Sequence, residues 1–222
     1  MIPVRFAVTL SVLKKAHRPE IPRKTIYRLS VYLRCLQRLK ANGIRTVSSE
    51  ALSKVAGVKP TQLRKDLTYF GQFGTRGLGY DVDQLTKMII DLLGTSSLQP
   101  VVLVGVGNMG TALLSYRGFQ EEGFEIVGAF DADVKRLREK KLPVPALGME
   151  DLADLIRAQH VKMAIITVPA MSAQEVTNTL VDAGITGILN FAPIVLVVPE
   201  DVMVSNVNLA MELESLSYFI QG

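Results

Sequence analysis

A glycine-rich segment in the middle of the chain has the spacing of a phosphate-binding turn. It reads GVGNMG, Gly105 to Gly110, and it follows the short apolar run Gln99–Val104, which is typical of a buried parallel strand. In such a turn the first glycine allows a tight bend, the second lets the backbone approach a pyrophosphate, and the third lets the helix pack on the strand. Because Thr111–Leu114 reads as the start of a helix, the segment predicts a dinucleotide site.

An acidic residue follows at the distance that a nucleotide ribose requires. Asp131 ends a second strand-like run, Glu125–Phe130, about twenty residues after the last glycine. A carboxylate there binds a ribose 2′-hydroxyl and repels a 2′-phosphate, so it favours NAD(H) over NADP(H). Lys135 and Arg136 are close in sequence and weaken that preference.

Helix and strand patterns alternate through the rest of the second half. We expect helices at 149–158 and 172–183, and strands at 164–167, 188–190 and 195–198. This order predicts an α/β fold with a Rossmann-type doubly wound parallel sheet, whose ligands bind at the carboxyl ends of the strands. Asn190 and Phe191 fall there and are expected beside a nicotinamide ring, although ordinary proline-ended loops would also explain these segments.

Charge is divided unevenly between the two halves of the 222-residue chain. Residues 1–100 hold 17 Lys+Arg and 6 Asp+Glu, a net charge of +11, whereas residues 101–222 hold 8 and 15, a net charge of −7. A basic segment joined to a nucleotide-binding one suggests a nucleotide sensor that contacts a polyanion such as nucleic acid.

The basic half predicts three helices in the order of a helix-turn-helix. The first runs from about Thr25 to Asn42-Gly43 and carries basic residues on its solvent face, namely Arg28, Arg34, Arg38 and Lys40. Ser48 or Ser49 caps the second helix, which continues through Val55, and the third begins at Pro60-Thr61. The third helix is then expected in the major groove, where Arg64 and Lys65 reach guanine edges or phosphates and Gln62 reaches adenine.

Taken alone, this third helix fits an ordinary amphipathic helix with a solvated charged face better than a DNA reader. The segment Phe70–Tyr80, FGQFGTRGLGY, favours DNA binding, because its glycines allow a hairpin wing with Arg76 at the tip. An arginine there reaches a phosphate or a narrow minor groove. The alternative is a purely structural glycine hairpin.

The remaining features exclude several classes of site. Cys35 is the only cysteine, and His17 and His160 lack metal-ligand spacing, so neither an intrachain disulfide nor a metal site is expected. The apolar run Phe6–Leu13 is shorter than the ~20 residues of a membrane span and lacks a cleavage pattern, so we expect a cytoplasmic protein. Residues 1–21 are expected to be a disordered extension or the result of a start codon assigned too early.

Two rival functions share the same fold. A small NAD-dependent dehydrogenase is disfavoured because no histidine follows a strand end, no Tyr-x-x-x-Lys pair occurs in the second half, and no substrate domain remains. A CoA-binding Rossmann module is disfavoured by Asp131. No catalytic residue is predicted.

Three segments together resemble the Rex family, redox-sensing transcriptional repressors of bacteria: QLRKDLTYFGQFGTRGLGY, GVGNMGTAL and GILNFAP. The resemblance covers about residues 22–222. It implies a homodimer of winged helix-turn-helix and Rossmann domains that binds an inverted-repeat DNA operator and releases it when NADH replaces NAD+. It also implies that the C-terminal helix, whose Leu209, Leu213, Leu216 and Ile220 share one face, is swapped between subunits.

The resemblance assigns residues and boundaries. The implied DNA contacts are Ser48, Ser49, Lys59, Gln62, Arg64, Lys65, Tyr69, Arg76 and Gly77. The implied NAD(H) contacts are Gly105, Val106, Gly107, Asn108, Met109, Gly110, Asp131, Thr167, Val168, Pro169, Asn190 and Phe191. The residues that couple nucleotide to domain orientation are Arg34, Tyr116 and Asn208. The expected domains are the extension at 1–21, the winged helix at 22–81, a linker helix at 82–98, the Rossmann domain at 99–204 and the swapped helix at 205–222.

One position departs from the family pattern. The family usually has Asn-Val-Asp in its C-terminal segment, where this chain has Asn206-Val207-Asn208. An amide can hydrogen-bond Arg34 but forfeits the charge-assisted part of that interaction, about 1 kcal/mol. We therefore expect a less steep switch, with DNA and NADH binding retained.

Overall fold

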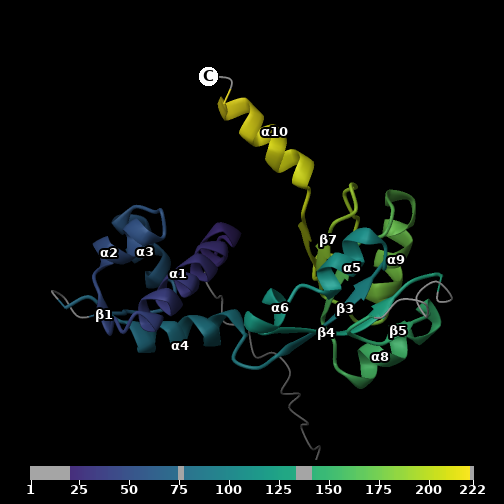
Figure 1. Cartoon of the computed structure of the whole chain (residues 1–222), viewed down its shortest axis with the longest axis horizontal. Helices are drawn as coiled ribbons and strands as arrows, with labels where there is room; N and C mark the ends of the chain where they lie inside the picture. Colours follow the sequence, from purple (N-terminus) through teal and green to yellow (C-terminus); the bar gives the residue numbers. More distant parts are fainter. Residues whose placement is uncertain (1–20, 75–77, 134–141, 221–222) are drawn as a thin grey trace, which may run out of the picture. The chain divides into compact units, whose positions relative to one another are not determined.

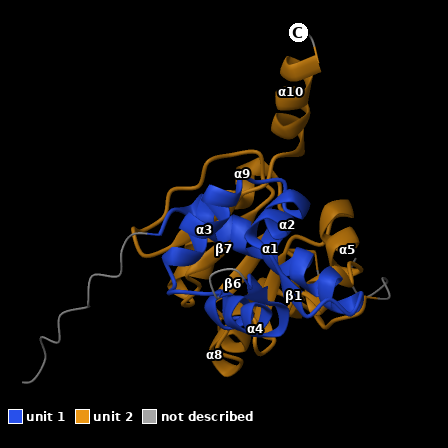
Figure 2. Ribbon diagram, turned by 90° about the vertical axis from the view of Figure 1, so that its left-hand side faces the viewer, with its two compact units in different colours: residues 1–94 blue, residues 95–222 orange. Residues whose placement is uncertain are grey.

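The structure is a computed structural model that describes residues 21–74, 78–133 and 142–220. The chain forms two compact units, residues 1–94 and residues 95–222 (Figure 2). Nearly all of the predicted extension, together with Arg76, Gly77, Lys135 and Arg136, lies outside the described residues. Within the described ranges, no helix combines the length and apolar character that a bilayer crossing requires.

The N-terminal unit contains the three predicted helices and one more (Figure 1). Its elements are α1 (Arg23–Ala41), β1 (Thr46–Val47), α2 (Ser49–Val55), α3 (Pro60–Thr68), β2 (Tyr80–Asp81) and α4 (Val82–Leu93). Asn42 caps the end of α1, where the sequence predicts a stop. Ser48 caps the start of α2, because its hydroxyl accepts a hydrogen bond from the Ala51 amide at 3.0 Å.

Helix α4 lies within the range 82–98, where the sequence predicts a linker helix, and it packs in the core of the N-terminal unit. Leu85 and Ile89 are buried in the same cluster as Leu29 of α1. Asp81 caps the start of α4 by accepting from the Gln84 amide at 2.8 Å, and Gly94 ends the helix in the left-handed conformation. The apolar stripe of α4 needs a partner face, and α1 provides it.

The predicted wing differs from a simple hairpin in its described part. No strand occurs in 71–74 or 78–79, and β2 pairs in antiparallel register with β1, with Tyr80 opposite Val47. Gly79 has a φ of +82°, and a Cβ there would lie 2.4 Å from the Val47 carbonyl oxygen. Glycine is therefore required at Gly79 by its conformation and by its close approach to β1.

The C-terminal unit is built on a six-stranded parallel sheet, as the alternating pattern predicts. Its strand order is β5-β4-β3-β6-β7-β8, so the order reverses between β3 and β6. The strands are β3 (Gln99–Val104), β4 (Phe124–Phe130), β5 (Ala146–Leu147), β6 (Met163–Ile166), β7 (Gly187–Asn190) and β8 (Met203–Asn206). The carboxyl ends of β3 and β6 therefore flank the expected crevice of a Rossmann-type sheet.

Helices cover both faces of this sheet (Figure 1). Val101 and Leu103 of β3 belong to the cluster that includes α5 (Asn108–Leu114) and α6 (Gly118–Glu121). Val102 and Val104 belong to the opposite cluster, with α8 (Leu152–Ala158) and α9 (Ala170–Asp182). A short 3-10 turn, Met149–Asp151, precedes α8. The near-continuous apolar run of β3 thus reflects burial on two sides.

The sixth strand lies later in the chain than predicted. The apolar run at 195–198 is a loop between Pro193 and Pro199, in which Val195 and Val197 are exposed and Leu196 points into the core. The strand is instead β8, which pairs with β7 alone at the sheet edge. An edge strand needs less apolar character than a central one, so its pattern in the sequence is weak.

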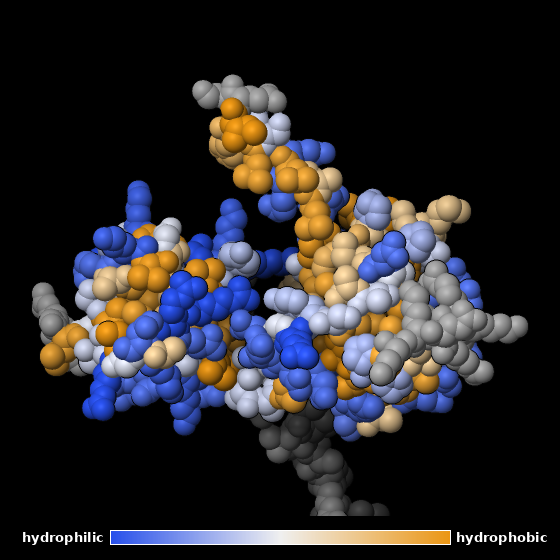
Figure 3. All heavy atoms as spheres, in the orientation of Figure 1, coloured by the Kyte–Doolittle hydropathy of each residue, from blue (hydrophilic) through white to orange (hydrophobic). Residues whose placement is uncertain are grey.

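Helix α10 (Leu209–Ile220) buries none of its residues. Its large apolar side chains are 58% to 81% exposed, and its surface appears as an apolar band in Figure 3. The helix predicted from the apolar spacing is therefore present, and the single chain does not cover its apolar surface.

Candidate functional site

The glycine turn lies between β3 and α5, and two of its glycines are required by the fold itself. Gly105 has a φ of +100°, and a Cβ there would come within 2.8 Å of the Thr167 backbone. A Cβ on Gly110 would come within 2.0 Å of the Gly105 carbonyl oxygen. The first turn of α5 therefore packs directly on the end of β3, as the motif predicts.

Gly107 has no such internal requirement. Its φ is −74°, and a Cβ there would meet no protein atom within 4 Å. Gly107 also caps the start of α5, where free backbone N–H groups favour an anion. The open space beside Gly107 is thus the place where a pyrophosphate can approach the backbone closely.

Asp131 lies beside this turn at the end of β4. Its Oδ2 accepts a hydrogen bond from the Val106 amide at 2.7 Å, and its Oδ1 accepts one from the Asp133 amide at 3.0 Å. The carboxylate is half-buried. The structure therefore brings together the acid and the glycine turn, which are about twenty residues apart in the sequence.

Thr167, at the end of β6, supports the turn from the other side. Its hydroxyl donates to the Gly105 carbonyl at 2.5 Å, and its amide donates to the Val104 carbonyl at 2.9 Å. Val168 and Pro169 lead into α9. Asn108 and Met109 are exposed at the start of α5. The strand ends predicted to form the crevice thus meet at the glycine turn.

Asn190 occupies a different environment from the one expected. Its side chain is fully buried, and its Nδ2 donates to the Ala192 and Ile194 carbonyls and to Asn206 Oδ1. Its Oδ1 accepts from the Ala192 amide at 2.9 Å. Asn190 therefore holds the turn after β7 and links it to β8, while Phe191 is half-buried against the α5 side of the sheet.

The expected coupling residues fall in both units. Arg34 is exposed on α1, and Tyr116 is 60% exposed with its ring edge-on to Phe119 at 5.1 Å. Asn208 Oδ1 accepts from the amides of Ala210 and Met211 at 3.0 and 3.3 Å, so it caps the start of α10.

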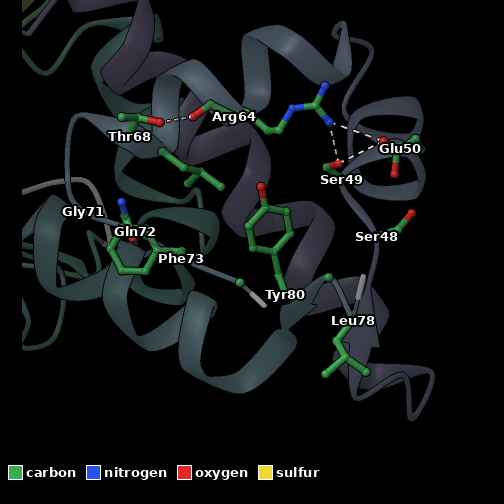
Figure 4. Close-up of a pocket in the computed structure, with 13 residues that line it drawn as sticks. Ser48, Ser49, Glu50, Arg64, Thr68, Gly71, Gln72, Phe73, Leu78 and Tyr80 are labelled. Carbon is green, nitrogen blue, oxygen red and sulfur yellow. Dashed lines mark hydrogen bonds and ion pairs between the residues drawn. The ribbon is translucent and has the colours of Figure 1, made fainter. Parts of the chain in front are cut away.

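Three of the expected DNA-contact residues, Ser48, Ser49 and Arg64, line a hollow of about 600 Å³ beside α2 and α3 (Figure 4). Arg64 Nη1 donates to Ser49 Oγ at 2.8 Å and lies 3.3 Å from Glu50 Oε1. Lys59 and Lys65 are exposed, and Tyr69 is half-buried at the end of α3. Glu50, an acid in the first turn of α2, therefore lies beside a basic residue that is expected to contact DNA.

Gln62 and Arg28 make contacts that the sequence does not reveal. Both bind Asp66, whose side chain is fully buried on α3: Gln62 Nε2 donates at 2.9 Å, and Arg28 Nε and Nη2 each donate at 2.6 Å. Tyr32 and Thr25 also donate to this carboxylate, at 2.7 and 3.2 Å. Gln62 thus has a partner on its own helix, and its contact with a base stays a prediction. The Arg28 side chain is only 23% exposed, so it is not on the solvent face as predicted.

Burial opposes ionisation of Asp66, but hydrogen bonds from Arg28, Tyr32 and Gln62 outweigh it and hold the pKa of Asp66 below its usual value. Burial, together with the hydrogen bond to Asp66, raises the pKa of Tyr32. Asp66 is the only acid in α3, and an acid on an otherwise basic helix is the feature of the sequence that indicates this network.

In the described part of the chain, no cluster of three His, Cys, Asp or Glu side chains is suited to a metal ion.

Two family models match the two units. A model described as the N-terminus of a putative DNA-binding protein matches residues 20–68, and a model described as a CoA binding domain matches residues 96–194. The residues of the helix-turn-helix and of the glycine turn therefore fall in separately recognised segments.

Curated relatives and solved structures match nearly the whole chain. The redox-sensing transcriptional repressor Rex of Carboxydothermus hydrogenoformans is 48% identical over 202 residues, 91% of this chain and 97% of the relative. The Rex protein of Desulforamulus reducens is 45% identical over 199 residues, 90% of this chain and 95% of the relative. A structure of RSP with β-NAD+ and operator DNA has a TM-score of 0.84 at 36% identity, covering 90% of this chain and 92% of that one. RSP with β-NADH has a TM-score of 0.80 at 35% identity, covering 90% and 94%.

Proposed function

Because this chain belongs to the Rex family of redox-sensing transcriptional repressors, we propose that it binds an operator and releases it when NADH occupies the crevice beside Gly107 and Asp131. The observation that carries this proposal is the open space beside Gly107, which no protein atom fills and which lies next to Asp131. The same chain presents Arg64 and Lys65 on an exposed helix.

The nucleotide acts as a ligand that changes DNA affinity. If NADH weakens operator binding by some factor, operator DNA must weaken NADH binding by the same factor. Discrimination between NADH and NAD+ requires a pocket that disfavours a positively charged ring. Apolar residues such as Phe191 and Ile194 impose a desolvation cost on the nicotinamide cation and not on the neutral dihydronicotinamide.

The proposal includes no catalytic step. The relatives are named as repressors. His160 lies between α8 and the amino-terminal end of β6, whereas the glycine turn follows the carboxyl end of β3. An NAD-dependent dehydrogenase would need a proton donor near the nicotinamide, and no histidine among the described residues lies at the carboxyl ends of the strands.

The functional form is a cytoplasmic homodimer that binds an inverted repeat. The exposed apolar side chains of α10 support this, because an apolar helix surface of this kind requires a partner. Exchange of α10 between subunits would cover it. The proposed DNA contacts are those that the sequence assigns, including Gln62, whose amide also donates to Asp66.

A CoA-binding function is the second candidate, because residues 96–194 match a CoA binding domain. Asp131 favours NAD(H), because a carboxylate at the end of β4 can bind a free ribose diol. The adenosine ribose of CoA carries a 3′-phosphate, which the same carboxylate would repel. A thermal-shift comparison separates NADH binding from CoA binding. We expect NADH to raise the unfolding temperature and CoA to leave it unchanged, and the reverse result would support a CoA-binding function.

The direct test is fluorescence anisotropy of a labelled inverted-repeat DNA, titrated separately with NADH and NAD+ at fixed salt. We expect NADH to release the DNA at concentrations where NAD+ does little. Tight binding that is indifferent to both nucleotides would contradict the proposed sensor.

A further inference from the structure

An ionised acid lies within the surface that is proposed to contact DNA. Glu50 is in the first turn of α2, and its side chain is 69% exposed beside that of Arg64, which is 49% exposed. A carboxylate at this position opposes DNA binding, because DNA phosphates are negative. Its placement therefore requires a reason other than affinity for the DNA backbone.

Glu50 and Ser49 together hold one side of the Arg64 guanidinium (Figure 4). Arg64 Nη1 donates to Ser49 Oγ at 2.8 Å and to Glu50 Oε1 at 3.3 Å, and the Ser49 hydroxyl donates to the same Glu50 oxygen at 3.1 Å. The backbone N–H of Glu50 and the Ser49 hydroxyl lower the pKa of Glu50, so this carboxylate is charged at neutral pH.

The other edge of the guanidinium stays open. Among the described residues, Arg64 Nε and Nη2 have no hydrogen-bond partner. Bidentate recognition of guanine O6 and N7 needs two donors on one guanidinium edge, held in a fixed direction. A guanidinium fixed at Nη1 has such an edge already oriented, whereas a freely rotating arginine accepts any phosphate.

We propose that Glu50 is a specificity-determining residue for DNA, which orients the free edge of Arg64 toward a guanine and penalises DNA that offers only phosphates. The inference rests on the proposed operator binding. A purely structural role is the competing explanation, since a first-turn acid also stabilises its helix. The two roles differ in their effect on sequence discrimination, which helix stabilisation alone does not change.

The test measures dissociation constants of wild type and Glu50→Gln for operator DNA and for a random duplex of equal length, at one salt concentration. We expect the variant to bind random DNA several-fold more tightly and the operator no more tightly, so that the ratio of the two constants falls about tenfold, the scale of one bidentate base contact. A second set of operators has each guanine replaced in turn. At one of these positions, the replacement should no longer weaken binding by Glu50→Gln, and the same position should become insensitive in Arg64→Ala.

Two controls make the outcome specific. Asp83→Asn removes another exposed carboxylate of the same unit, which pairs with Lys40 at 2.7 Å on α4 and α1, and it should leave the ratio unchanged. In an Arg64→Ala background, Glu50→Gln should no longer lower the ratio. An unchanged ratio, or an equal effect with and without Arg64, would overturn the proposal. Release of operator from wild type by NADH, measured in the same assay, tests the proposed function separately.

Discussion

Arg28 on α1 donates two hydrogen bonds of 2.6 Å, from Nε and Nη2, to the two carboxylate oxygens of Asp66 on α3. Asp66 is fully buried, and both of its oxygens also accept hydrogen bonds from other side chains: Oδ1 from Thr25 and Gln62, and Oδ2 from Tyr32. The helix that presents Arg64 is thus fixed to the core of its unit by a satisfied buried ion pair, the kind of polar network that specifies one orientation.

Asp66→Asn should lower the free energy of unfolding at pH 7 by about 3 kcal/mol, because it leaves the Arg28 guanidinium without its counter-charge in a mostly buried site. Urea unfolding of the two proteins measures this difference. Asp83→Asn, at an exposed ion pair, is the control and should cost less than about 1 kcal/mol.

The same pair predicts a pH dependence. Since the folded pKa of Asp66 is below its unfolded value, its contribution is complete above about pH 4, the unfolded pKa, and is lost as the pH falls through the folded pKa. The stability difference between wild type and Asp66→Asn should therefore narrow in acid. A difference of equal size at pH 7 and pH 2.5 would show that charge is not its source.

Gly107→Ala and Gly110→Ala should have opposite signatures. At Gly107 an added Cβ meets no protein atom and the backbone is relaxed, so stability should change by less than about 0.5 kcal/mol while NADH affinity falls at least about tenfold. At Gly110 the Cβ meets the Gly105 carbonyl, so the fold itself is destabilised. Thermal unfolding without ligand and NADH titration separate the two effects. Unchanged NADH affinity in Gly107→Ala would show that the pyrophosphate does not bind beside Gly107.

Asp131→Ala should weaken NADH binding by about 1.5–3 kcal/mol, the loss of a hydrogen bond to a charged group. Operator binding by nucleotide-free protein should be retained, because Asp131 lies at the glycine turn, where it accepts hydrogen bonds from the Val106 and Asp133 amides, and is not among the residues proposed to contact DNA. NADH titration of the operator complex measures this. Release of DNA at wild-type NADH concentrations would exclude Asp131 from the nucleotide site.

The sequence predicts the parts of this fold whose signals are local. The strand at Gln99–Val104, the Ser48 cap and the glycine turn follow from neighbouring residues, and all three are present. The contacts that the sequence does not reveal involve partners distant in the chain. Gln62 pairs with an acid that α1 also contacts, and Asn190 pairs with Asn206 across β7 and β8, so neither orientation is visible in a single helix or strand. Because the sequence predicts the last strand at 195–198 and not at β8, it gives no indication that Asn190 pairs with Asn206.

The apolar side chains of α10 predict a concentration-dependent assembly. Replacing Leu213 and Leu216 by Glu should convert a dimer into a monomer, because both side chains are exposed in the single chain and need an apolar partner. Light scattering measures the mass. Ser215→Glu adds a single negative charge on another side of the helix and should leave the dimer intact. A dimer that survives the double substitution would show that α10 is not its interface.

Asn208→Asp tests the departure of this chain from its family. Asn208 Oδ1 already caps α10, and an aspartate keeps that cap, so α10 should be retained or slightly stabilised. If position 208 also pairs with Arg34, the added charge strengthens the coupling between nucleotide and DNA by about 1 kcal/mol, or roughly fivefold in the ratio of operator dissociation constants with and without NADH. Anisotropy titrations measure this ratio, and Arg34→Ala should abolish the gain. A ratio that stays constant while α10 is stabilised would mean that position 208 acts only as a helix cap, so that coupling between the nucleotide and DNA uses other residues.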